Sequence, residues 1–193
     1  MRGTTIRPTS GTTGWLELRW LPVRILVYAV GISALHTCNY KVLAAALLRK
    51  IIGSTGSEEI LAVMSSRSQL DEVVGDLHRF KGKRTPLSDL LFEVVQPLAI
   101  ETIGSDLSVE SAFDRWEYFL GLVEFHKSTI RGFLGRYHWK YRRDPLPARF
   151  RKEVEAQGTA WQALSTGFFD GSLQQYQQTA DRFQERLDRV HWF

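Results

Sequence analysis

Hydrophobic side chains recur at intervals of three and four along most of this chain, which is the pattern of amphipathic helices. The longest run predicts a helix from about Val109 to Leu134, capped by Ser108. Another run steps by three and four from Leu173 onward and predicts a final helix to about His191, suited to closing a bundle. The fold is therefore expected to be mostly α, as one multi-helix domain.

An N-terminal helical hairpin is predicted from two apolar stripes separated by a tight break. The first helix is expected at Pro22–His36 and the second at about Tyr40–Ile52. Small residues, among them Gly31 and Ala44, would let the two helices approach closely. The spacing is also that of one tetratricopeptide-type unit, but no second copy follows, which favours a plain hairpin.

Loops rich in glycine, proline and basic residues separate the remaining elements. The loop Gly53–Gly56 is followed by Ser57, a candidate helix cap. Phe80–Arg84 is a basic loop, and Thr85–Pro86 has the cap-then-proline signature of a helix start. Pro97 is expected to interrupt or restart that helix. Further helices are predicted at 69–77 and 148–164.

The segment 136–143 breaks the helical period and alternates aromatic with basic side chains. A period of two predicts a short β element here. Aromatic rings interleaved with Arg and Lys can stack bases and neutralise phosphates, so this segment is a candidate nucleic-acid or partner site. Alternatively, the aromatic rings face the core and the cations face solvent or acidic neighbours, the reading we favour. The candidate binding residues are Arg136, His138, Trp139, Lys140, Arg142 and Arg143.

Charge is distributed in blocks, although the net charge is only +4. Residues 51–130 hold thirteen acidic side chains against seven basic ones, whereas residues 131–152 hold eight basic side chains against one acidic. Such blocks can contact each other inside one fold, and a basic block can also face nucleic acid or an acidic protein.

No catalytic or metal-binding motif is visible. The five histidines lack metal-ligand spacing, and one cysteine cannot build a zinc site, so no metal or cofactor is expected. The glycine-rich loop lacks the ending of a phosphate loop, and no serine lies in a nucleophile elbow. Asp114 and Glu117 share a helix face, for which a solvated face is the usual explanation. We therefore expect a protein that is not an enzyme.

Location and domain limits follow from composition. A single cysteine, Cys38, is typical of a reducing compartment, so we expect a cytoplasmic protein. The apolar stretch Ile25–Leu35 is shorter than the roughly 20 residues that span a membrane, so no membrane association is expected. Residues 1–14 predict a flexible tail, and residues 15–193 predict a single helical domain.

Several packing motifs also resemble a known group of proteins. Ile25–Leu35 with Leu43–Leu48, then Thr85–Ser88, Ala112–Val123 and Gly135–Lys140, are similar to the C-terminal helical region of large bacterial proteins. Those proteins carry P-loop ATPase or sirtuin-like modules of the kind found in defence against phage. The resemblance implies a non-enzymatic interaction or regulatory module, acting as a subunit or stand-alone relative beside a separate effector ATPase or nuclease. The alternative is a nucleic-acid-binding module that uses the basic aromatic segment 131–152.

Overall fold

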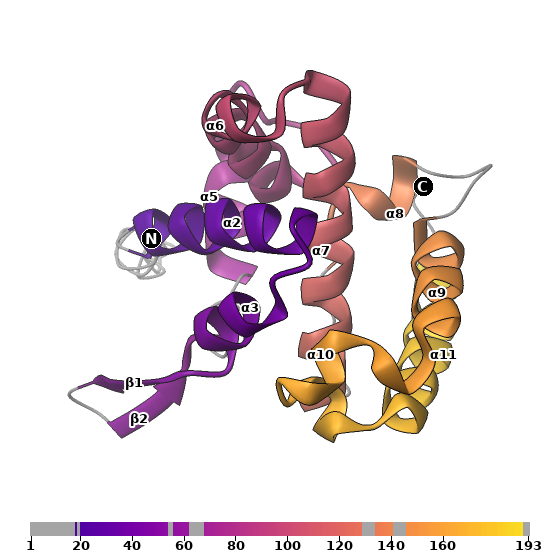
Figure 1. Ribbon diagram of the computed structural model, residues 1–193. Helices are drawn as coiled ribbons and strands as arrows, with labels where there is room; N and C mark the ends of the chain where they lie inside the picture. The colour runs from indigo at the N-terminus through magenta and orange to yellow at the C-terminus, as the bar shows by residue number, and fades with distance from the viewer. Residues whose placement is uncertain are drawn as a thin grey trace, which may run out of the picture.

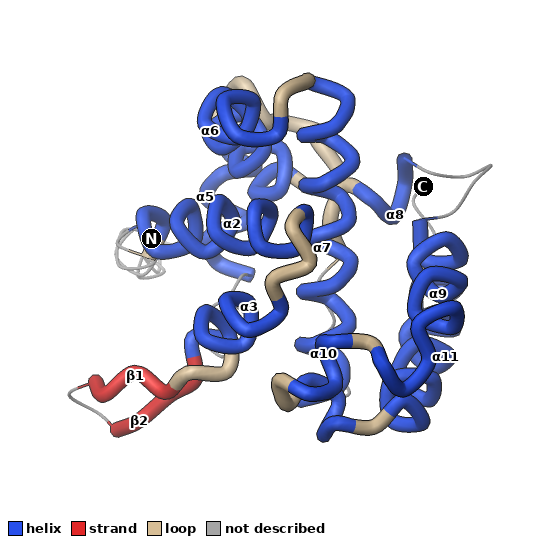
Figure 2. Tube along the Cα trace, viewed as in Figure 1, coloured by secondary structure: helices blue, strands red, loops and turns tan. Residues whose placement is uncertain are grey.

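The computed structural model describes residues 18, 20–53, 56–61, 68–128, 134–140 and 146–190 of the chain. These residues form a single, mostly helical domain, which confirms the predicted fold class (Figures 1 and 2).

Helix α7 (Asp106–Ser128) forms the central spine of the molecule (Figure 1). Helices α2, α3, α5 and α6 lie to one side of it, α8, α9 and α11 lie to the other, and α10 lies at its lower end. With partners on both sides, α7 buries residues around its whole circumference, including Phe113, Trp116 and Phe119. It begins earlier than the cap predicted at Ser108, because the hydroxyl of Ser105 accepts the N–H of Ser108 (3.3 Å) in the first turn.

The predicted N-terminal hairpin is present as α2 (Leu21–His36) and α3 (Tyr40–Leu47). The side chain of Asn39 caps α3 by accepting the N–H of Val42 (3.3 Å). The expected role of Gly31 between these two helices is wrong. A Cβ atom on Gly31 would lie 2.5 Å from the ring of Trp116 on α7. The glycine therefore allows α2 to pack closely against α7, and not against α3.

A two-stranded antiparallel sheet follows, where the sequence predicted the end of a helix and a new cap at Ser57. Strands β1 (Lys50–Gly53) and β2 (Gly56–Glu59) pair with Lys50 opposite Glu59 and Gly53 opposite Gly56. Consecutive β-branched residues Ile51 and Ile52 disfavour a helix and favour a strand, and Gly53 and Gly56 are residues typical of turns.

Helices α5 (Ser68–Asp76) and α6 (Pro86–Ile103) complete this half of the molecule. Helix α6 runs unbroken through Pro97, so the expected interruption is wrong. Pro97 is exposed, while Val95 and Ala99 beside it are buried, so packing on the opposite face holds the helix through the missing hydrogen bond.

The short β element predicted around 136–143 is also wrong for the part that the structure describes. Residues Tyr137–Lys140 form one helical turn, α8, Arg136 lies just before it, and residues 141–143 lie outside the described residues. Arg136 and Lys140 are four positions apart, so in a helical turn they face the same side and both reach α7.

The C-terminal part closes the domain with α9 (Leu146–Gln157), η1 (Gly158–Ala160), α10 (Gln162–Ser165), η2 (Phe168–Gly171) and α11 (Leu173–Arg189). The helix predicted through residue 164 breaks at Gly158, whose φ of 56° lies in the left-handed region. Trp161 then packs among aromatic rings, stacked on Phe169 and edge-on to Tyr176. Helix α11 matches its prediction within two residues.

Within the described residues, every helix is too short or too polar to cross a membrane.

Candidate functional site

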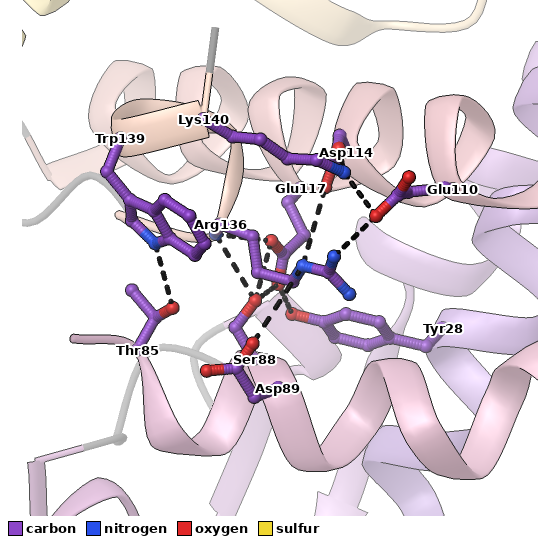
Figure 3. Close-up of polar contacts among 10 residues, drawn as sticks. All are labelled: Tyr28, Thr85, Ser88, Asp89, Glu110, Asp114, Glu117, Arg136, Trp139 and Lys140. Carbon is purple, nitrogen blue, oxygen red and sulfur yellow. Dashed lines mark hydrogen bonds and ion pairs between the residues drawn. The ribbon is translucent and has the colours of Figure 1, made fainter. Parts of the chain in front are cut away.

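A buried polar network lies where α8 meets α6 and α7 (Figure 3). Its centre is Glu117, whose side chain is fully buried. The Glu117 carboxylate accepts the hydroxyl of Tyr28 (3.1 Å) from α2 and the hydroxyl of Ser88 (2.7 and 2.8 Å) from α6. It also accepts the backbone N–H of Arg136 (3.0 Å) at the start of α8. One carboxylate thus connects three elements to α7.

The second half of the network is ionic. The Arg136 guanidinium donates to Glu110 (2.7 Å) and lies about 4 Å from the carboxylates of Asp89 (3.9 Å) and Asp114 (4.0 Å). Its flat face rests 3.9 Å from the centre of the Phe92 ring. Guanidinium groups tolerate such half-apolar surroundings because they are planar and weakly hydrated.

Lys140 adds the second cation of the network. Its ammonium pairs with Glu110 and donates to Asp114 (3.2 Å). Asp114 is fully buried, so its carboxylate needs such partners in place of water.

The spacing along α7 explains why these acids meet α8. Glu110, Asp114 and Glu117 are separated by four and three positions, so they form one stripe along the helix. Arg136 and Lys140 repeat the spacing of four and match that stripe. The expected solvated face at Asp114 and Glu117 is wrong, because α6 and α8 cover both carboxylates.

Two of the carboxylates have pKa values that move in opposite directions. Burial raises the pKa of Asp89, and the charges of Arg136 and Lys83 counteract this only in part. Burial also acts to raise the pKa of Glu110, but the hydrogen bond and charge of Lys140, together with Arg136, outweigh it and lower the pKa. Glu110 is thus held in its charged form by ion pairs with both cations.

The structure places four of the six candidate binding residues on or beside α8. Arg136 is buried and Lys140 is half-buried, with their charges directed at the acidic stripe. His138 Nε2 lies 2.9 Å from the carbonyl oxygen of Leu187, and Trp139 Nε1 donates to the hydroxyl of Thr85 (3.3 Å). Arg142 and Arg143 lie outside the described residues.

These contacts support the interpretation in which residues 136–140 pack inside the fold, with their cations facing acidic neighbours. They also leave the carboxylates of the network few free positions at which to bind or react with a ligand. Glu117 is closed to solvent and fully occupied by donors, so it has no accessible face for acid–base work. Sequence reasoning missed the partners Tyr28 and Ser88. No local signal marks them, since they are 89 and 29 residues away from Glu117. Among the described residues, no group of three His, Cys, Asp or Glu side chains is placed to hold a metal ion.

A different feature faces solvent, an apolar groove between α2 and α6 with a volume of about 290 Å³. Val30 and Ile32 line one wall, and Leu98 and Ile103 line the other. We call it the α2–α6 groove. Exposed apolar side chains continue along both helices beyond it, with Leu26 64% exposed.

Comparisons of this chain with models of protein families, with curated proteins and with solved structures find no match.

Proposed function

We propose that this domain is a non-enzymatic interaction module that binds a partner protein through the α2–α6 groove. One observation carries the proposal: large apolar side chains are exposed in pairs, one helical turn apart, on two helices that pack together. Leu26 and Val30 form the pair on α2, and Val94 and Leu98 form the pair on α6. Contiguous exposed apolar surface beside a hollow is typical of a protein-binding surface.

The charge around the groove indicates the chemistry of the partner. Residues 25–35, which include the α2 wall, contain no charged side chain, whereas exposed Glu101 lies beside the α6 wall. Asp106, also exposed, follows at the start of α7. The segment that fits is an amphipathic helix with apolar anchors at positions i, i+4 and i+7 and with Lys or Arg at its margins.

The buried network supports a scaffold role for the polar interior. Its acids and bases satisfy one another and fix α8, which leaves binding to the outer surface. In the light of the resemblance described above, the proposed partner is a separate effector subunit, an ATPase or a nuclease.

Nucleic-acid binding through segment 131–152 is the weaker candidate, because Arg136 and Lys140 already face carboxylates. That prediction now depends on residues such as Arg142 and Arg143, outside the described part of the chain.

A designed peptide tests the groove directly. The probe is a labelled helical peptide with leucines at i, i+4 and i+7 and lysines elsewhere, and its binding is followed by fluorescence anisotropy. The double variant Val30→Asp/Leu98→Asp should weaken binding at least about tenfold, since two exposed residues that line the groove lose their apolar contact. Leu77→Asp is the matched control, because Leu77 is 49% exposed and lies outside the groove.

Three outcomes contradict the proposal. Equal affinity of the double variant and the wild type would remove the groove from the interface. If a peptide whose leucines are changed to serine binds with equal affinity, the binding is due to the charge of the lysines and not to apolar contacts with the groove. A dimer of this chain that Leu98→Asp dissociates would assign the groove to a second copy.

A further inference from the structure

The turn between α5 and α6 carries a cluster of cations separate from those of α8. Arg79, Lys81, Lys83 and Arg84 are all exposed within six positions. We call residues 78–84 the basic turn. It lies outside segment 131–152, for which nucleic-acid binding was the alternative interpretation of the sequence.

The backbone of the basic turn is tightly folded, so the chain positions that carry its cations are fixed although their side chains are exposed. Phe80 is 3% exposed and anchors the turn in the core. The N–H of Phe80 donates to the carbonyl of Leu77 (2.8 Å), and the N–H of Lys83 donates to the carbonyl of Phe80 (3.0 Å). Gly82 has a φ of 77°, in the left-handed region that glycine adopts without strain.

Among the described residues, ion pairs neutralise only one of the four cations of this turn. In the part of the chain that the structure describes, Lys81, Lys83 and Arg84 make no ion pair, and only Arg79 has one, with Glu93 (2.5 Å). The nearest influence is on Asp89, a half-buried carboxyl whose pKa Lys83 helps to lower against the effect of burial. The carboxylate of Asp71 accepts the N–H of Leu87 (3.1 Å) at the start of α6. This N–H is therefore not available to an anion, and an anion that binds the turn would contact the Lys and Arg side chains instead.

This is the reverse of the situation at α8, where Arg136 and Lys140 are neutralised by the acidic stripe. Exposed cations without partners keep their attraction for mobile anions, whereas paired ones do not.

We propose that the basic turn binds the phosphate backbone of nucleic acid, without reading its sequence. Three exposed cations that make no ion pair among the described residues suit a repeating chain of phosphates, and contacts to phosphates position a protein without specifying bases. Phe80 is buried and cannot stack on bases, which leaves the exposed cations, with the imidazole of His78 beside them, to meet the nucleic acid. The inference is independent of partner binding at the α2–α6 groove.

Salt dependence of binding to a labelled 20-base-pair duplex provides the test. Three phosphate contacts by Lys81, Lys83 and Arg84 predict a log–log slope of about −2.7, which is a loss of about 40-fold between about 50 and about 200 mM salt. The variant Lys81→Gln/Lys83→Gln/Arg84→Gln should bind at least about tenfold more weakly at low salt and have a slope near zero. Its melting temperature should match the wild type, because exposed cations contribute little to stability.

A matched control removes the same charge elsewhere, as Lys41→Gln/Lys50→Gln/Lys127→Gln, all exposed positions outside both the basic turn and segment 131–152. This control should keep the wild-type slope. If it loses as much affinity as the turn variant, binding follows net charge and the proposed site is wrong. A single charge reversal, Lys83→Glu, provides a second variant with minimal change to the fold, and wild-type affinity in it would also overturn the site.

Two further outcomes decide what the turn recognises. If Arg142→Gln/Arg143→Gln abolishes binding while the turn variant does not, the site belongs to segment 131–152 instead. If polyglutamate of equal charge competes as well as the duplex, the surface fits an acidic protein and the nucleic-acid assignment fails.

Discussion

The carboxylate of Glu117 accepts hydrogen bonds from α2, from α6 and from the backbone at the start of α8, with no exposure to water. Glu117→Gln would place an amide N–H₂ group among donors and remove the charge that they solvate. We expect a loss of about 1.5–3 kcal/mol in the free energy of unfolding, since hydrogen bonds to a buried charge are stronger than neutral ones. Urea denaturation measures the change.

The control for this prediction is Glu101→Gln, an exposed carboxylate on α6. It should alter the free energy of unfolding by no more than about 0.5 kcal/mol. Equal midpoints for the two variants would show that the network does not stabilise the fold.

Gly31 illustrates a close approach that only glycine permits. The Cβ of Gly31→Ala would meet three ring carbons of Trp116 at 2.5–2.6 Å, and Trp116 is fully buried and cannot move aside freely. The variant should therefore lose about 1–3 kcal/mol through overpacking, despite the better helix propensity of alanine.

Gly75→Ala on α5 separates these two effects. Its Cβ would meet Pro86 at 3.4 Å, an ordinary contact, so thermal melting should show little change or a small gain. If both variants melt alike, the contact between Gly31 and Trp116 is not tight in solution.

At the scale of the element, the sequence pattern predicted long helices well and short elements poorly. α7 and α11 follow from their hydrophobic spacing, because an amphipathic repeat over many turns admits few alternatives. In α8 the period was misleading, since four residues fit either a strand or one helical turn. Such a short helix is not stable alone, and the tertiary contacts of Arg136 and Tyr137 decide its conformation.

The candidate site was only partly predictable for a related reason. The segment around residue 136 stood out correctly as unusual, and the acidic stripe of α7 was visible as spacing. The packing of helices that are far apart in sequence decides which cations form ion pairs. No local sequence pattern contains this information. The basic turn and the segment at α8 are both rich in Lys and Arg. Among the described residues, three cations of the basic turn make no ion pair, whereas Arg136 and Lys140 pair with the acidic stripe of α7.

The attachment of α8 to α7 should depend on pH in two opposing ways. The folded-state pKa of Glu110 is lowered, so its stabilising effect is present above its unfolded pKa of about 4.3 and is lost as the pH falls through the folded value. Glu110→Gln should therefore destabilise the protein near pH 7, by an amount that shrinks in acid.

The folded-state pKa of Asp89 is raised, so its contribution to stability changes with pH in the opposite direction to that of Glu110. Its favourable contribution is present below its unfolded pKa of about 3.9 and is lost as the pH rises through the folded value. Relative to wild type, Asp89→Asn should become more stable as the pH rises from about 3 to about 7. Urea denaturation across this range compares the two variants, and parallel pH profiles would contradict the opposite environments of these carboxyls.

At the scale of the whole molecule, α7 joins an N-terminal half that carries the groove and the basic turn to an aromatic C-terminal half (Figure 1). The two halves also meet directly. Trp161 Nε1 donates to the hydroxyl of Tyr40 on α3 (2.9 Å), across 121 positions of sequence. Both proposed binding surfaces therefore rest on a framework that extends through the entire core.

Trp161→Ala tests whether that framework unfolds as one unit. The ring is 1% exposed and contacts Phe169, Tyr176 and Phe119, so its removal should lower the free energy of unfolding by about 3–5 kcal/mol. Because the halves share α7, native-state hydrogen exchange should accelerate in the slowest amides of α2 and α6 as much as in those of α11. Leu107→Ala, at a position 81% exposed, should leave both unchanged. Faster exchange confined to α11 would instead mean that the C-terminal half opens independently of the N-terminal half.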